Sequence, residues 1–305
     1  MMKKVLVTGG TAFVSRYVAE YYVKKGMDVY VLNRNSRKQP KGVRLIEADR
    51  RRIGDRLRKY CFDAVLDITA YTAEDIHSLL DALGSYDRFI MISSSAVYPE
   101  CEKQPFTEET PVGKNKFWGS YGIGKIEAER ALRERDPKAY ILRPPYLYGP
   151  LNNVYREAFV FDCAMAKRPF FLPGDGEMKL QFFHVNDLCR FMDILMEKTP
   201  GQRVFHVGNR EAVSVKEWAV LCYYVAGESF RFQNVSKEIE QRNYFSFYDY
   251  EYYLDVEKQT ALMPCTKMLA EGLKESFEWY RENRDCVKKK PFLEYIDNYL
   301  IKNLR

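Results

Sequence analysis

The sequence has few of the residues that bind metals or form disulfide frameworks. Among its 305 residues there are only three histidines, His77, His184 and His206. Its seven cysteines form no C-x-x-C pair, and their number is odd. A metal site is therefore not expected, and the cysteines are expected to be reduced thiols, as in a cytosolic protein.

Long apolar runs and strong charge of one sign are also missing. No segment is apolar enough to cross a membrane, and the basic start at Met1 to Lys4 leads straight into a short strand-like run without a cleavage site. We therefore expect a cytoplasmic protein without a membrane partner. The net charge of +6 is small beside 48 basic and 42 acidic residues. It permits an anionic ligand but requires neither that nor a nucleic acid.

Up to about residue 150, short apolar runs alternate with amphipathic segments. Strands are predicted at residues 3–8, 28–33, 43–48, 63–68, 88–94 and 139–143. Between the first two, Val14, Val18, Tyr21 and Tyr22 recur at helical spacing before Gly26 ends the helix. This pattern predicts an α/β fold with a Rossmann-like, doubly wound parallel sheet.

Beyond residue 150 the alternation weakens, which favours a smaller C-terminal substrate-binding region. Two more strand-like runs, at residues 181–185 and 203–208, are compatible with a return to the first sheet. We therefore predict a dinucleotide-binding domain at 1–150 with 181–208, and a substrate-binding region at 151–180 with 209–305. The aromatic segment 243–255 is interpreted as packing rather than as a stacking platform for bases.

The segment after the first strand reads "VTGGTAFVSR" and is an irregular dinucleotide fingerprint. Gly9 and Gly10 allow the sharp turn that aims helix N–H groups at a pyrophosphate. Ala12 stands where a second glycine is usual, and it is tolerable if its φ is negative. Ser15 is small enough for the packing of helix against strand. A purely structural turn remains the alternative.

The end of the second strand bears on the choice of cofactor. An acid there would bind the ribose 2′-hydroxyl of NAD, but the chain has Asn33 followed by Arg34. A guanidinium suits the 2′-phosphate of NADP, while a solvated basic loop is an equally good interpretation of this stretch alone. Asp49, after the third strand, is placed to meet an adenine amino group.

Two further motifs suggest acid–base chemistry. "YGIGK" places Tyr121 and Lys125 four residues apart, hence on one face of a helix. A cation beside a phenol favours the phenolate and so a general base. Upstream, "MISSSAVYPE" sets three serines at the end of a predicted strand, where α/β proteins bind their ligands.

Together, "VTGGTAFVSR", "SSSAVYPE", "YGIGK", "RPPYLYGP", "FFHVNDL" and "FHVGN" resemble the extended short-chain dehydrogenase/reductase superfamily, particularly its NAD(P)-dependent nucleotide-sugar epimerases and dehydratases. The resemblance covers nearly the whole chain. It implies NAD or NADP as cofactor, a nucleotide-sugar substrate, and Ser94, Tyr121 and Lys125 as catalytic residues. Counting back from Val97 selects Ser94 among the three serines. Tyr121 would deprotonate a sugar hydroxyl, Ser94 would hold that oxygen, and Lys125 would bind the nicotinamide ribose.

The same resemblance implies a set of ligand contacts. Cofactor contacts are expected from Gly9, Gly10, Thr11, Ala12, Phe13, Val14, Asn33, Arg34, Asp49, Arg50, Ala70, Tyr121, Lys125 and Pro144, and substrate contacts from Ser94, Tyr146, Arg156 and Lys179. A homodimer is left open.

Two departures from the family pattern concern the substrate. Where many relatives carry Arg-Asp to clamp a diphosphate, this chain has Leu180 and Gln181, so Lys179 or Arg156 would have to supply the charge. Tyr146 and Leu147 stand where an asparagine is common. The alternative is an atypical member of the superfamily, resembling the chloroplast stem-loop-binding proteins, that binds RNA or acts as a dinucleotide sensor. Retention of Ser94, Tyr121 and Lys125 favours the enzyme.

Overall fold

The computed structural model describes residues 2–302, and it divides into two compact units. The first unit comprises Met1–Leu147, Phe183–Arg210 and Leu254–Thr266, and the second comprises Tyr148–Phe182, Glu211–Tyr253 and Lys267–Arg305. Each unit is described by itself below. None of the helices within residues 2–302 is both long and apolar enough to span a bilayer.

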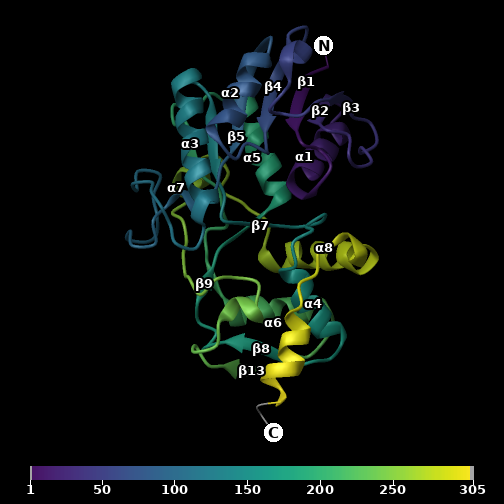
Figure 1. The fold of residues 1–305 in the computed structure, drawn as a ribbon, viewed down its shortest axis with the longest axis vertical. Helices are drawn as coiled ribbons and strands as arrows, with labels where there is room; N and C mark the ends of the chain where they lie inside the picture. Colours follow the sequence, from purple (N-terminus) through teal and green to yellow (C-terminus); the bar gives the residue numbers. More distant parts are fainter. Residues whose placement is uncertain (1, 303–305) are drawn as a thin grey trace. The chain divides into compact units, whose positions relative to one another are not determined.

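The first unit is built on a seven-stranded sheet in the order β11-β6-β5-β4-β1-β2-β3. All of its strand pairs are parallel (Figure 1). Its strands are β1 (Lys4–Thr8), β2 (Asp28–Asn33), β3 (Arg44–Glu47), β4 (Cys61–Asp67), β5 (Ser85–Ile92), β6 (Tyr140–Arg143) and β11 (Val204–His206). The order reverses direction at β1, as in a doubly wound sheet. The predicted fold class is therefore confirmed.

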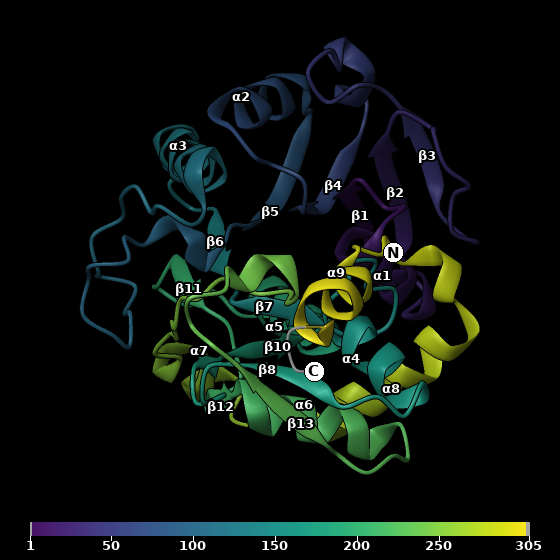
Figure 2. The same cartoon turned by 60° about the horizontal axis from the view of Figure 1, so that its bottom comes forward.

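Helices cover both faces of this sheet, which explains why its strands are apolar throughout rather than alternating. Helices α1 (Phe13–Lys24) and α5 (Val185–Glu197) lie on one face, and α2 (Ala73–Ala82) and α3 (Gly119–Arg135) lie on the other (Figure 2). Short 3-10 turns η1 (Gly54–Leu57) and η2 (Ser95–Val97) and helix α7 (Glu257–Leu262) complete the unit.

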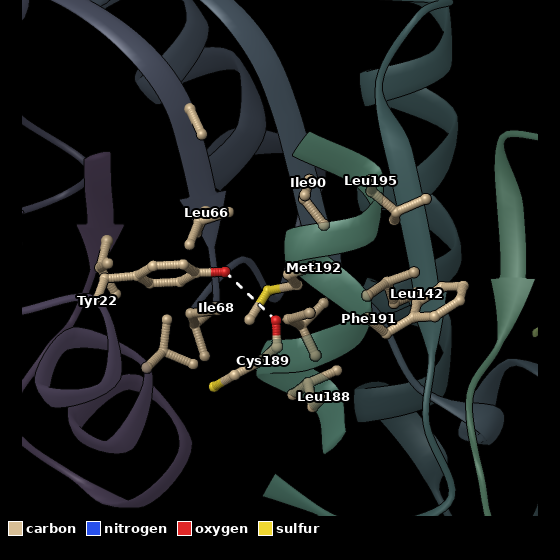
Figure 3. Packing of buried hydrophobic residues seen from close by; sticks show 14 of the residues in the cluster. Tyr22, Leu66, Ile68, Ile90, Leu142, Leu188, Cys189, Phe191, Met192 and Leu195 are labelled. Carbon is tan, nitrogen blue, oxygen red and sulfur yellow. Dashed lines mark hydrogen bonds between the residues drawn. The ribbon is translucent and has the colours of Figure 1, made fainter. Parts of the chain in front are cut away.

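The α1/α5 face shows how a polar group is accommodated in an apolar layer. Tyr22 is fully buried and points toward Leu66, Ile68 and Met192 (Figure 3). Its hydroxyl lies 3.5 Å from the main-chain oxygen of Cys189. Tyr22 therefore links α1 to α5 by a hydrogen bond within the apolar layer that covers this face of the sheet.

Of the two late strand-like runs, only one joins the main sheet. β11 extends the edge beside β6, with Val204 opposite Ile141. The other run forms β10 (Phe182–His184), which lies outside the seven-stranded sheet. It is short because His184 already caps α5, its side chain accepting a hydrogen bond from the Asn186 N–H. His184 is fully buried, as expected for a packed strand-end histidine.

The second unit combines short strand pairs with helices. β8 (Phe170–Pro173) pairs in parallel with β13 (Phe232–Val235), and β9 (Lys179–Leu180) pairs antiparallel with β12 (Val213–Ser214). The helices are α4 (Glu157–Met165), α6 (Val215–Val225), α8 (Leu269–Glu282) and α9 (Phe292–Tyr295), and shorter turns are η3 (Gln241–Asn243), η4 (Arg284–Cys286) and the π-type η5 (Ile296–Leu300). β7 (Tyr146–Tyr148) and β10 contain points where the chain passes between the units.

Aromatic side chains form much of the core of the second unit. Trp218 is fully buried and stacks on Phe182, with ring centroids 5.7 Å apart. Tyr244, Phe245 and Phe247 of the aromatic segment are buried as well. The interpretation of that segment as packing rather than a base-stacking platform is confirmed for these residues.

Candidate functional site

The glycine loop after β1 makes a sharp turn that depends on its two glycines. Gly9 and Gly10 have φ of 88° and 90°, values that disfavour any other residue. A Cβ atom on Gly10 would lie 2.5 Å from Val31 Cγ1, so β2 also requires a glycine there. Ala12 has φ of −141° and precedes α1 as its N-cap. The methyl group of Ala12 therefore adds no backbone strain.

The rest of the loop supports the start of α1. The Ser15 hydroxyl donates to the Ala12 carbonyl at 2.9 Å. Thr11, Phe13 and Val14 are half-buried, and Phe13 has φ of 31°. The first turn of α1, whose N–H groups have no partner within the helix, thus includes Phe13 and Val14, two of the residues predicted to contact the cofactor.

Asn33, at the end of β2, holds the glycine loop in place. Its side-chain amide donates to the Gly9 carbonyl at 2.6 Å and exchanges hydrogen bonds with the Gln39 amide at 3.0 and 3.1 Å. The next residue, Arg34, is exposed. No acid follows β2 at the position that would bind a ribose 2′-hydroxyl.

A pocket of about 480 Å³ opens at the carboxyl ends of β1, β2 and β4. It is lined by Gly9, Leu32, Asn33, Arg34, Ala48, Asp49, Arg50, Arg51, Thr69, Tyr71 and Asp75. Four of the predicted cofactor residues besides Gly9 therefore share one cavity: Asn33, Arg34, Asp49 and Arg50. Asp49 is exposed, and one of its carboxylate oxygens accepts the Arg51 N–H at 2.9 Å.

Arg50 lies in this pocket, but its guanidinium is bound within the protein. It makes two 3.0 Å hydrogen bonds to the Asp67 carboxylate, and further bonds to the Thr69 hydroxyl and the Asp75 carbonyl. Asp67 also accepts from the Thr8 hydroxyl at 2.7 Å. Burial by itself would raise the pKa of Asp67, but the charge and hydrogen bonds of Arg50 outweigh burial and lower it.

Helix α3 carries Tyr121 and Lys125 on one face, as predicted. The Lys125 ammonium lies 5.9 Å from the Tyr121 ring centroid. It donates to the carbonyl of Ala70, beyond the end of β4, at 2.6 Å and to that of Ile92, the last residue of β5, at 2.8 Å. Burial lowers the pKa of Lys125 to about 8. Tyr121 is 40% exposed, so its ring is accessible from outside.

Two glycines of "YGIGK" bring α3 close to the loops of the site. A Cβ atom on Gly122 would lie 2.4 Å from the Ala96 carbonyl oxygen, and one on Gly124 would lie 2.3 Å from that of Tyr71. Neither distance is possible for a real side chain, so only glycine allows this approach. The motif thus positions Tyr121 and Lys125 against the ends of β4 and β5.

The three serines after β5 differ in their surroundings. Ser93 is buried and donates to Glu129 at 2.5 Å, and Ser95 is buried with its N–H bound to the Pro144 carbonyl. Ser94 is partly exposed, and its hydroxyl oxygen accepts the Ala96 N–H at 3.1 Å. Of the three serines, Ser94 is therefore the one that is not buried.

The predicted substrate residues fall in both units. Tyr146 belongs to the first unit, is half-buried, and lies 6.4 Å from Trp118 between ring centroids. Arg156 and Lys179 belong to the second unit, where Lys179 is exposed and its N–H donates to Glu251.

Comparison with known proteins supports the same fold and family. The family model described as "NAD dependent epimerase/dehydratase family" matches residues 5–208. The chain belongs to the NAD-dependent epimerase/dehydratase family. This also confirms that it is an enzyme of a nicotinamide-dependent family, as predicted.

Curated relatives of this family member include both functional classes considered above. The chloroplast stem-loop binding protein of 41 kDa b from Arabidopsis thaliana is 27% identical over 302 residues, covering 90% of this chain and 78% of that protein. UDP-glucose 4-epimerase from Corynebacterium glutamicum is 25% identical, covering 73% of this chain and 80% of that protein. The solved UDP-glucose 4-epimerase of Thermotoga maritima is 22% identical, with a TM-score of 0.73 and coverage of 92% and 99%. This last likeness shows the fold.

The residues of the first unit fit the family's cofactor. The glycine turn, the open pocket and the first turn of α1 lie together at the carboxyl ends of the strands, and the pocket combines arginine side chains with polar groups. Sequence reasoning missed Tyr71, Thr69 and Asp75 in this pocket. The available signal for Thr69 and Tyr71 was their position directly after β4, a buried strand that neighbours β1, whereas Asp75 lies in the first turn of α2.

Proposed function

We propose that this enzyme is a nucleotide-sugar epimerase or dehydratase that uses Tyr121 as general base. The observation that carries the proposal is the arrangement of α3, in which the Lys125 ammonium lies beside the accessible Tyr121 ring. Lys125 also donates to the Ile92 carbonyl at the end of β5, two residues before Ser94, the one of the three serines that is not buried. An RNA-binding role would require none of these three groups.

In the proposed reaction Tyr121 takes the proton from a sugar hydroxyl. The Lys125 charge favours the phenolate form that accepts this proton. The Ser94 hydroxyl donates a hydrogen bond to the same sugar oxygen and orients it toward Tyr121. The cofactor, when bound, supplies the site with a hydride acceptor and donor.

The glycine loop and the pocket are the proposed holders of that cofactor. Gly9, Gly10 and the first turn of α1 would bind its pyrophosphate, and Lys125 its nicotinamide ribose. Arg34 would bind a 2′-phosphate, so NADP is proposed to bind at least as well as NAD. That Arg156 and Lys179 contact the substrate diphosphate stays a prediction.

The test is turnover of a panel of UDP-, GDP- and dTDP-sugars, followed by NMR of the sugar ring. Tyr121→Phe should bind the cofactor nearly as well as wild type, because only one hydroxyl is lost, and should turn over about 10² to 10⁴ times more slowly. Ser94→Ala should slow turnover as well, with Ser93→Ala as the neighbouring comparison. Wild-type rates in the Tyr121→Phe variant would disprove the catalytic assignment.

The second candidate function is RNA binding, favoured by the likeness to the stem-loop binding protein over 90% of the chain. If RNA is the ligand, affinity for a structured RNA should be submicromolar near physiological salt and fall steeply with added salt, since phosphate contacts release counterions. We expect weak binding without preference for one RNA. Tight binding to one stem-loop, unchanged in Tyr121→Phe, would favour the second function.

A further inference from the structure

Tyr71 lies in the candidate site, but the proposed reaction gives it no role. It follows β4 by four residues, and its N–H donates to the Asp75 carboxylate at 2.8 Å. Its carbonyl lies against Gly124 of α3, where no side chain could fit. The carbonyl of the preceding residue, Ala70, accepts from Lys125. The main chain at Tyr71 is thus held from both α2 and α3.

The ring of Tyr71 lies over the Lys125 ammonium. The distance from Nζ to the Tyr71 centroid is 4.9 Å, compared with 5.9 Å to Tyr121, and the two ring centroids are 6.2 Å apart. Lys125 itself is 2% exposed, whereas Tyr71 is 51% exposed. Tyr71 therefore stands between the ammonium and the outside, beside the ring of the proposed base.

The other groups around the ammonium are charged. On the sheet side, Asp67 of β4 is paired with Arg50; Asp75 comes from α2 and Glu129 from α3. Asp75 is also paired with Arg50, and Glu129 with Arg143, so each of the three carboxylates already has a cationic partner. The main-chain carbonyls of Ala70 and Ile92 and the rings of Tyr71 and Tyr121, by contrast, have no salt bridge with another cation.

We propose that Tyr71 is a positioning residue for the Tyr121–Lys125 pair: its ring covers the ammonium and stabilises the charged form that Tyr121 needs. The face of an aromatic ring attracts a cation electrostatically, and the attraction is stronger where water is excluded. The catalytic meaning of this assignment rests on the proposed function, whereas the effect on Lys125 does not. Tyr71 also lines the dinucleotide pocket, so the same ring borders both parts of the site.

The physical test follows the charge of Lys125 directly. Protein carrying ¹³C/¹⁵N-lysine is titrated between pH 6 and pH 11, and the Hε–Cε signal of Lys125 is identified by its absence in Lys125→Arg. Tyr71→Leu keeps an apolar cover but removes the ring, so the midpoint should fall by about one unit. Tyr71→Phe keeps the ring and should titrate like wild type. Tyr224→Leu makes the same exchange at a tyrosine of α6 that is 73% exposed, and it serves as the control: the Lys125 midpoint should stay at the wild-type value.

A second arm measures turnover and its pH profile. With Tyr71 in the proposed role, the alkaline limb of the profile should move in Tyr71→Leu by the same amount as the Lys125 midpoint, and Tyr71→Phe should restore its position. An unchanged Lys125 midpoint in folded Tyr71→Leu would overturn the inference. A shifted midpoint in a protein whose wild type turns over no nucleotide sugar would instead overturn the proposed function and leave the role of Tyr71 standing.

Discussion

At the scale of single residues, neighbours with the same chemistry have different surroundings. Ser93 and Ser94 are adjacent, but Ser93 is buried and bound to a buried carboxylate, whereas Ser94 is partly exposed. Arg50 and Arg34 line one pocket, but Arg50 is held by Asp67 while Arg34 is exposed. Burial and partners, rather than residue type, separate the groups available to a ligand.

Arg34 provides the prediction at this scale. Arg34→Ala should weaken NADP binding by about 1 to 3 kcal/mol, the contribution of a charged hydrogen bond, and leave NAD binding nearly unchanged. Calorimetric titration of both dinucleotides is the measurement. Arg37→Ala, on the same exposed loop but outside the residues that line the pocket, is the matched control. Equal losses for both dinucleotides would contradict a contact with the 2′-phosphate.

At the scale of elements, the site depends on how closely α3 approaches the sheet edge. Gly122 and Gly124 allow that approach, and Lys125 then reaches two main-chain carbonyls, one beyond β4 and one at the last residue of β5. Compared with two alanines, two interior glycines reduce the intrinsic stability of a helix by about 2 kcal/mol. Packing against the loops of Tyr71 and Ala96 must offset that cost.

Gly124→Ala should therefore destabilise the protein although alanine is the better helix former. The added methyl group would lie 2.3 Å from the Tyr71 oxygen, and the resulting shift of α3 should cost about 1 to 3 kcal/mol in the free energy of unfolding. Urea unfolding measures this. Gly201→Ala is the control, since a Cβ there meets nothing within 4 Å and the residue has no positive φ. A stabilised Gly124→Ala would mean that α3 can move away freely.

Much of this element-level arrangement follows from local sequence. The strand at 28–33 and the helix between the first two strands agree with the apolar pattern, because buried parallel strands and amphipathic helices differ in period. The pairing of Arg50 with Asp67 and the position of Tyr71 over Lys125 could not be predicted. Those contacts join residues 17 and 54 positions apart, and no periodic pattern encodes which loop side chains meet.

At the scale of the whole molecule, buried polar groups make stability depend on pH. His206 bridges Tyr98 and the Asp255 carbonyl, and burial lowers its pKa to about 4. In unfolded chains a histidine has a pKa near 6.5, so the unfolded state binds more protons between about pH 6.5 and pH 4. Stability is therefore lost as the pH falls through that window and is retained above it.

The expected loss from this one group is about 3 kcal/mol between pH 7 and pH 4. Urea unfolding at intervals across this range measures the slope. His206→Gln should be less stable at pH 7 but should lose less on acidification than wild type. Identical slopes for His206→Gln and wild type would assign the acid sensitivity to other groups.

The hydrogen bond from Asn33 to the Gly9 carbonyl limits how the proposed cofactor site can evolve. An aspartate at that position is one substitution away and would bring the acid that prefers NAD. It would also replace the amide donor by a carboxylate 2.6 Å from a carbonyl oxygen, so that both facing atoms would be acceptors. It would disturb the glycine turn itself, and with it the binding of either dinucleotide. A lineage leading from this protein to NAD preference must therefore change the loop first, or acquire its acid elsewhere.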